Sequence, residues 1–214
     1  MARTDRNQAQ DRHSQLRARA LRKATVVHDG SAFQLAADLR AYGFDVAEGP
    51  LLASSTTHGD LGSLAVIATR AGATRSERMQ DWTRQLCWNG STVLAVGAAT
   101  GPVAEFFGTR RTMPSDEPVS GRLTNIHHAD EGLFASLPEK FRLALPAADG
   151  FLASELSSEF RATAQTQDGE LIGASHVFRP VHLLHAGAME SREVRSVVLK
   201  NLLRLMRENG GRAF

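Results

Sequence analysis

The sequence predicts an α/β protein built as a three-layer, doubly wound, mainly parallel sheet with a small antiparallel insert. Strand patterns alternate with helical patterns through the first half of the chain, as in parallel sheets whose strands are connected by helices. Thr92–Val96 is a nearly continuous apolar run, which is typical of a parallel strand covered on both faces. In the second half, Asp168-Gly169 separates two strand patterns and indicates an antiparallel hairpin.

The first half contains four expected strands and three expected helices. The strands are Ala24–His28, Asp45–Glu48, Leu64–Ala68 and Thr92–Val96. Ser31 is placed to cap the first helix, which ends at Gly43, and Thr74–Glu77 has the spacing of a capping box for the second. Asn89-Gly90 ends that second helix. A third, short helix follows the fourth strand and ends at Gly108.

The second half changes to antiparallel strand patterns before it returns to a buried strand and a final helix. The antiparallel strands are expected at Phe141–Leu145, Phe160–Thr166 and Leu171–His176. Val181–His185 has the apolar pattern of a buried strand. Ser191 opens a helix with one apolar face that ends at Gly210. With 214 residues in total, we expect one domain over residues 24–214.

Residues 1–23 form a basic arm that differs from the rest of the chain. They contain seven Arg and Lys against two Asp, a charge of +5, whereas the whole chain carries +2 and the remainder therefore −3. The arm is either disordered and solvated or a helix that docks on a partner. Because the net positive charge comes from the arm alone, nucleic-acid binding by the domain is not expected, and binding by the arm is a minor alternative.

The cysteine count and the apolar pattern indicate the compartment. A single cysteine, Cys87, excludes an intramolecular disulfide and a cysteine-rich zinc module. Residues 1–23 lack the apolar core of a secretory signal, and no apolar run reaches the roughly 18 residues that span a membrane. We therefore expect a cytoplasmic protein that does not associate with membranes.

Candidate site residues follow the strands, because ligands of doubly wound sheets bind beyond the carboxyl ends of the parallel strands. The three candidate segments are residues 71–74, Gly97–Gly101 and His185–Ala188. Many α/β enzymes place a nucleophile at a sharp turn between strand and helix. Here that turn begins with Gly97, and neither it nor Ala98 supplies a nucleophile. Thr100 is expected to cap the following helix rather than to attack a substrate.

Three segments without catalytic residues resemble the motifs of one known family. Asp29–Phe33 is similar to D-x-x-S-F, and Ala104–Gly108 is similar to A-E-x-F-G. Ile126–Pro138 is similar to I-x-H-x-x-x-G-L-F-x-x-L-P. Together they resemble the class I glutamine amidotransferases, specifically the small subunit of anthranilate synthase and aminodeoxychorismate synthase. The resemblance covers nearly the whole chain after residue 23 and implies the flavodoxin-like fold of that family.

The resemblance also implies that the catalytic cysteine is missing. The family's G-V-C-L-G-H-Q segment corresponds to Ala95–Gly101, so Gly97 occupies the position of the nucleophile. The family needs that thiolate to attack the side-chain amide of glutamine and form a thioester. Cys87 lies on the preceding helix and is expected to be structural. The oxyanion loop keeps Gly72 but loses its two prolines, and the glutamine-binding Y-H-S-L segment is absent.

A histidine remains where the family has its catalytic base. The H-P-E motif corresponds to His185-Ala186-Gly187, which keeps the histidine and replaces its orienting carboxylate by Gly187. If the segment contains an insertion, Glu190 is a displaced carboxylate. The alternative is that His185 is a structural or solvated histidine.

The remaining candidate groups indicate an anion site at most. Arg70 and Arg75 flank Gly72 and either hold an anion or form an ion pair with Glu77. Backbone N–H groups of the helix that begins near Gly101 are further anion donors. The pairs His127/His128 and His182/His185 each alternate between opposite strand faces, so no metal site is expected. No cofactor is expected either.

Two hypotheses of different classes follow. The first is a catalytically degenerate glutamine amidotransferase-like protein, a pseudo-glutaminase, that serves as a structural or regulatory subunit of a chorismate-using or related biosynthetic enzyme. Its partner would be a larger synthase subunit, with a homodimer as the alternative. The second is an enzyme with altered chemistry that uses the pocket around His185 and Gly97, with a small carboxylate as ligand.

Overall fold

A computed structural model describes residues 23–29, 34–50, 63–69, 77–110, 122–145 and 152–210. The arm lies outside this part of the chain, except for Lys23, which begins the first strand. The strands are β1 (Lys23–His28), β2 (Asp45–Pro50), β3 (Leu64–Thr69), β4 (Thr92–Gly97), β5 (Arg122–His128), β6 (Lys140–Leu145), β7 (Phe160–Thr166), β8 (Leu171–His176) and β9 (Val181–Leu184). The helices are α2 (Leu35–Ala41), α3 (Glu77–Trp88), α4 (Thr100–Phe106), α5 (Ala186–Glu190) and α6 (Arg192–Gly210), with 3-10 turns η1 (Gly132–Phe134) and η2 (Ala153–Glu155).

The nine strands form one continuous sheet in the order β2-β1-β3-β4-β9-β8-β7-β5-β6. The first five strands of this order are parallel, and the last four pair in antiparallel fashion. The predicted doubly wound α/β class is therefore confirmed. The antiparallel strands β5–β8 are inserted in the chain between β4 and β9, as expected, and they continue the same sheet beyond β9, because β8 pairs along β9.

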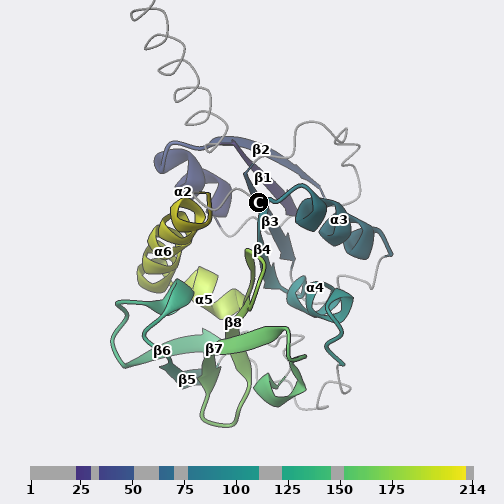
Figure 1. Ribbon diagram of the computed structural model, residues 1–214. Coiled ribbons are helices and arrows are strands. Elements are labelled where there is room, and N and C mark those ends of the chain that lie inside the picture. The colour runs from purple at the N-terminus through teal and green to yellow at the C-terminus, as the bar shows by residue number, and fades with distance from the viewer. Residues whose placement is uncertain are drawn as a thin grey trace, which may run out of the picture.

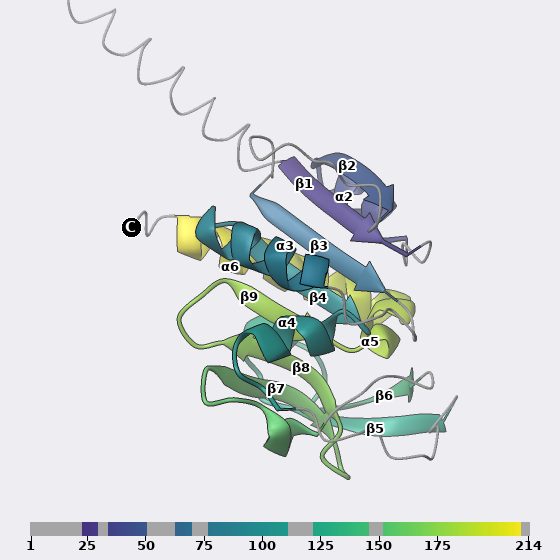
Figure 2. The same cartoon turned by 90° about the vertical axis from the view of Figure 1, so that its right-hand side faces the viewer.

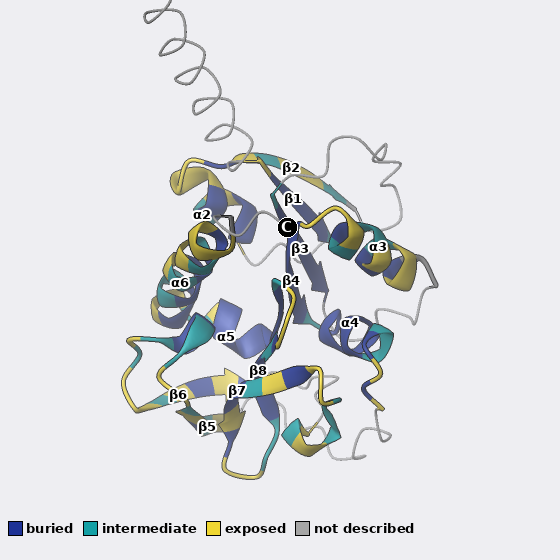
Figure 3. Cartoon of the chain, viewed as in Figure 1, coloured by how far each residue is buried: buried dark blue, intermediate teal, exposed yellow. Residues whose placement is uncertain are grey.

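Helices cover both faces of the sheet in three layers. Figure 1 shows α2, α5 and α6 on one face and α3 and α4 on the other, and Figure 2 shows the sheet running past them from β2 to β6. The central strands β3 and β4 are buried almost throughout (Figure 3), as their continuous apolar runs predict. No helix in the described part of the chain is long and apolar enough to cross a membrane.

The expected elements are present, with three differences. Strand β5, which lies between β7 and the edge strand β6, was not expected, because its residues Arg122–His128 are mostly polar. The expected strand Val181–His185 ends one residue earlier, and His185 instead caps the unexpected short helix α5. Ser31 and residues 74–76, the expected caps of α2 and α3, lie outside the described residues. Ser191 accepts a hydrogen bond from the N–H of Val194 and opens α6 as expected.

A buried arginine on α6 ties three helices together. Arg195 is only 8% exposed. Its Nε donates to Asp38 Oδ2 on α2 at 2.6 Å, and its NH1 donates to the carbonyl oxygen of Met189 on α5, also at 2.6 Å. Charge-assisted bonds of this kind are stronger than hydrogen bonds between neutral groups.

Replacing Arg195 by methionine is expected to lower the free energy of unfolding by about 2 kcal/mol, because the substitution leaves Asp38 and a buried carbonyl without their donor. Arg204, on the exposed face of the same helix, pairs with Glu208 at 3.1 Å and serves as the matched control. Arg204→Met should change stability by less than about 0.5 kcal/mol. Urea unfolding measures both; equal effects would contradict the role of Arg195.

Candidate functional site

Three neighbouring strands bring the candidate residues to one edge of the sheet, here called the carboxyl edge and defined by Thr69, Gly97 and His185. Thr69 ends β3 and lies opposite Gly97 at the end of β4. Val96 pairs with Leu184, so Gly97 and His185 are the next residues along β4 and β9. The parallel register therefore places the elbow glycine and the retained histidine on adjacent strands.

The turn after β4, residues 97–101, is called the elbow. Gly97 has a φ of +66°, in the left-handed region that favours glycine. The N–H of Ala98 donates to the carbonyl oxygen of Thr69 at 3.0 Å. A Cβ added to Gly97 would overlap that same carbonyl oxygen and would lie 3.5 Å from the Cβ of Ala186. The neighbouring strand β3 therefore leaves no space for a side chain at Gly97.

The elbow contains no nucleophile. Ala98 and Gly101 are buried, and Thr100 is 7% exposed. The expectation that Thr100 caps α4 is wrong, because Ala99 holds the cap position and Thr100 Oγ1 instead donates backward to the carbonyl oxygen of Gly97 at 2.8 Å. That hydroxyl therefore holds the turn together.

His185 is held in one tautomer by its own helix. It caps α5, where its Nδ1 accepts the backbone N–H of Gly187 at 3.1 Å. With Nδ1 as an acceptor, the proton of the neutral ring is on Nε2. That atom is buried, has no hydrogen bond, and lies 3.6 Å from Oε1 of Glu170. Burial lowers the pKa of His185 to about 4, so the ring is neutral at pH 7.

Glu170 is the carboxylate that faces this histidine, and the sequence patterns did not single it out. It directly precedes β8, which pairs with β9 in antiparallel fashion. Burial, and to a smaller extent the charge of Asp168, raise the pKa of Glu170. Glu190, the expected displaced carboxylate, is exposed at the end of α5, and the described part of the chain contains no ion pair between it and His185. The signal that could have found Glu170 is its position just after the Asp168-Gly169 turn.

The position of Gly187, where the sequence predicts a replaced carboxylate, is also closed. A Cβ there would lie 2.7 Å from the carbonyl oxygen of Ala144 and 3.2 Å from the side chain of Leu145, both on β6. Real Cβ atoms do not approach a backbone oxygen so closely. A carboxylate at this position would therefore require a shift of β6 or α5.

Comparison with known proteins decides the fold family. No protein-family model matches the chain. Over 64 residues, 30% of the chain, it is 36% identical to an aminodeoxychorismate synthase of Streptomyces pristinaespiralis, and this match spans 9% of that protein. Of solved structures, a GMP synthase subunit of Thermoplasma acidophilum superposes with a TM-score of 0.71 at 17% identity, covering 88% of this chain and 96% of that one. The fold is that of the glutamine amidotransferases. A glutamine amidotransferase of Thermotoga maritima superposes with a TM-score of 0.61 at 11% identity, covering 89% of this chain and 91% of that one.

Part of the predicted site in this amidotransferase fold lies outside the described residues. Arg70, Gly72 and Arg75 all belong to the undescribed segment after β3. The described neighbour of that segment is Thr69, whose Oγ1 is buried without a hydrogen-bond partner. Thr69 Oγ1 and His185 Nε2 are therefore two buried polar atoms without hydrogen bonds at the carboxyl edge of the amidotransferase fold.

Cys87 is at the opposite end of the amidotransferase fold from the elbow. It lies in the last turn of α3, next to the segment that leads into β4. Burial raises the pKa of its thiol to about 11, and the charge of Arg179 opposes this only in part. The thiol is thus protonated at neutral pH, which agrees with the structural role expected for it.

Three other histidines have local partners. His128 Nε2 lies 2.8 Å from the carbonyl oxygen of Pro138, and His182 Nδ1 lies 2.9 Å from Ser175 Oγ. His176 Nε2 lies 3.0 Å from Glu159. Within the described ranges, no three His, Cys, Asp or Glu side chains are grouped so that they could hold a metal ion.

Proposed function

We propose that the chain is a catalytically degenerate member of the glutamine amidotransferase fold that serves as a structural or regulatory subunit of a chorismate-using or related biosynthetic enzyme. One observation carries the proposal: at the position of the nucleophile stands Gly97, and a side chain there would overlap the Thr69 carbonyl oxygen. A thioester with glutamine needs a thiol at this point. The closed position at Gly187 supports the same interpretation.

The proposal of a partner subunit is supported by the proteins that the chain is similar to. The similarity to an aminodeoxychorismate synthase supports a biosynthetic enzyme that uses chorismate. The structurally similar GMP synthase protein is itself named as a subunit, which supports a partner. We infer that this chain binds a larger synthase subunit, with a homodimer as the alternative. Purification of the tagged full chain from its native host tests this: a synthase subunit in stoichiometric amount supports the proposal, and a monomer without one contradicts it.

The purified protein is expected to release no glutamate from glutamine, alone or with the co-purified synthase. The reason is the missing thiolate, because Cys87 is protonated and lies at the other end of β4 from the elbow. A coupled glutamate dehydrogenase assay measures this, with an active glutamine amidotransferase as the positive control. Glutamate release by the original protein that the Cys87→Ser variant no longer shows would contradict the proposal.

A second candidate function is favoured by the pairing of His185 with Glu170. A neutral histidine beside a carboxylate of raised pKa is an arrangement that can move a proton. In this alternative the protein is an enzyme of altered chemistry with a small carboxylate as ligand at the carboxyl edge. A thermal-shift titration with succinate, glutarate and L-glutamate discriminates the two. Stabilisation by one of these acids that His185→Ala abolishes favours the enzyme, and no stabilisation favours the subunit.

A further inference from the structure

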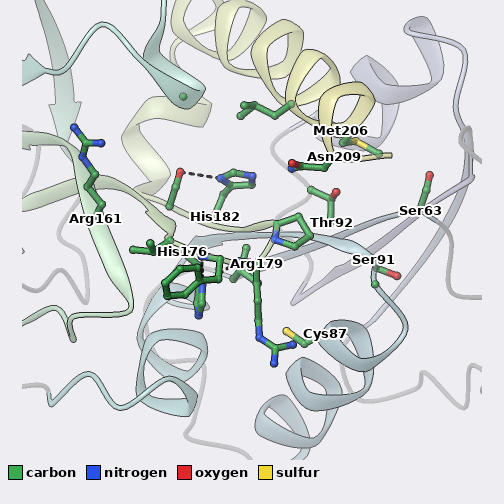
Figure 4. A pocket seen from close by; sticks show the side chains of 18 of the residues that line it. Ser63, Cys87, Ser91, Thr92, Arg161, His176, Arg179, His182, Met206 and Asn209 are labelled. Atoms are coloured by element: carbon green, nitrogen blue, oxygen red, sulfur yellow. Dashed lines mark hydrogen bonds between the residues drawn. The ribbon is translucent and has the colours of Figure 1, made fainter. Parts of the chain in front are cut away.

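A cavity of about 1080 Å³ opens at the edge of the sheet opposite the elbow, where β4 and β9 begin. We call this the amino-edge cavity. Thr92 and Val181, the first residues of β4 and β9, line it together with the end of α6. Figure 4 shows His182, Thr92, Met206 and Asn209 around it. Neither the elbow nor His185 lines this cavity.

Two of its lining residues carry buried polar atoms without hydrogen bonds: Nε2 of His182 and Oγ1 of Thr163. A buried polar atom without a partner costs about 1–3 kcal/mol, so native proteins rarely keep one unless a ligand, ion or water satisfies it. Two such atoms among the residues that line one cavity indicate that a polar molecule belongs there.

His182 supplies one of these groups. The residue is 5% exposed. Its Nδ1 lies 2.9 Å from Ser175 Oγ, and Figure 4 shows the other side of the ring turned toward Asn209. Because a serine hydroxyl both donates and accepts, either neutral tautomer is compatible with Ser175. Nε2 can therefore donate to a ligand or accept from one.

Two opposite charges lie together at the cavity wall. Arg161 NH2 forms an ion pair with Glu131 Oε1 at 2.9 Å, and both side chains are partly exposed, so the other N–H groups of the guanidinium and the second carboxylate oxygen can meet another molecule. A molecule with a carboxylate and an adjacent amino or hydroxyl group complements this pair, since the carboxylate meets the guanidinium and the N–H or O–H meets Glu131. Leu205, Met206 and Pro180 supply apolar wall for the rest of such a molecule.

We propose that the amino-edge cavity binds a small α-amino or α-hydroxy carboxylic acid, with its acid group at Arg161, its amino or hydroxyl group at Glu131, and a polar atom of its body at His182. The site is separate from the carboxyl edge and does not depend on the proposed subunit role. Ligand binding here would stabilise the contact of β7, β8 and β9 with the end of α6, all of which contribute to the wall.

The test is calorimetric titration of the full chain with the standard L-amino acids and with the α-hydroxy acids of the same side chains. At least one probe is expected to bind with a Kd of millimolar or lower, and the two arms distinguish amino from hydroxy acids. For the best probe, Arg161→Gln and His182→Leu should each raise the Kd at least about tenfold, or 1.4 kcal/mol. Removal of the probe's carboxylate should have a similar effect.

Arg142→Gln is the matched control, because Arg142 is exposed on β6 and does not line the cavity. It should leave the Kd within about twofold of the original. If His182→Leu does not fold, His182→Gln, which keeps a nitrogen near Nε2, should retain binding, and the imidazole ¹⁵N signal of His182 in the original protein should move with the probe. Absence of binding by every probe, or a Kd that these variants leave unchanged, would show that water alone fills the cavity and would overturn the proposal.

Discussion

Acidification from neutral pH to about pH 4 is expected to lower the free energy of unfolding by on the order of 5 kcal/mol, because two buried histidines must remain neutral in the folded protein. Burial lowers the pKa of His182 and of His185 from 6.5 to about 4. A change of this size in one group corresponds to roughly 3 kcal/mol. Since small domains are stable by about 5–15 kcal/mol, the protein should unfold in mild acid.

The direction follows from proton uptake. Between pH 6.5 and about 4 the unfolded chain binds protons on these two histidines and the folded protein does not. The contribution of the two neutral histidines to the free energy of unfolding is therefore fully present above pH 6.5 and is lost as the pH falls through this window. His176, whose pKa burial also lowers, acts in the same direction. Glu170 opposes it, because its raised pKa lets the folded protein take up a proton first.

Urea unfolding at a series of pH values measures this dependence. His182→Gln and His185→Gln should each flatten the slope of stability against pH, because glutamine does not titrate. His127 is exposed on β5, so His127→Gln should leave the slope unchanged. A stability that is constant from pH 7 to 4.5 would contradict the burial of both rings in their neutral form.

Gly97→Ala is expected to lower the free energy of unfolding by about 3 kcal/mol or more, which is the second largest effect we predict after that of acid. The added Cβ overlaps the Thr69 carbonyl oxygen, which is a backbone atom and cannot rotate away. The positive φ adds a smaller cost. Gly97→Cys should be destabilised as strongly and should still release no glutamate, because the thiol can be accommodated only if β3 or the elbow moves.

Gly108→Ala separates these two contributions. Gly108 follows α4 with a φ of +81°, and an added Cβ there meets nothing within 4 Å. It should therefore show only the cost of the left-handed backbone, about 1 kcal/mol. Thermal and urea unfolding of both variants give the comparison. Equal losses for Gly97→Ala and Gly108→Ala would show that the Thr69 carbonyl oxygen does not close the elbow.

The fold could be predicted because its signals are local. Continuous apolar runs marked β3 and β4, and the Asp168-Gly169 turn marked the hairpin of β7 and β8. The polar strand β5 has no such signal, since its pairing depends on β6 and β7 rather than on its own pattern. Helix α5 was missed because a five-residue helix is too short to show periodicity.

The sequence predicted the site residues that follow the end of a single strand, but not the residues that neighbouring strands bring beside them. The elbow and His185 follow from the ends of β4 and β9, but Glu170 approaches from an antiparallel strand. Cross-strand neighbours depend on register, which a single sequence specifies weakly. The amino-edge cavity was missed for the same reason, because Thr163, Ser175 and His182 belong to three strands.

The two carbonyl oxygens that face Gly97 and Gly187 also bear on how such a protein can change over generations. One comes from Thr69 on β3 and the other from Ala144 on β6, at opposite sides of β4 and β9 in the sheet. A point mutation that introduces a cysteine at Gly97 or a carboxylate at Gly187 brings the new side chain against backbone, and its accommodation requires a prior shift in a different strand. We therefore expect epistasis between these glycines and the neighbouring strands: laboratory selection for glutaminase activity from this chain should first accumulate substitutions in β3 and β6, and only afterwards at the two glycines.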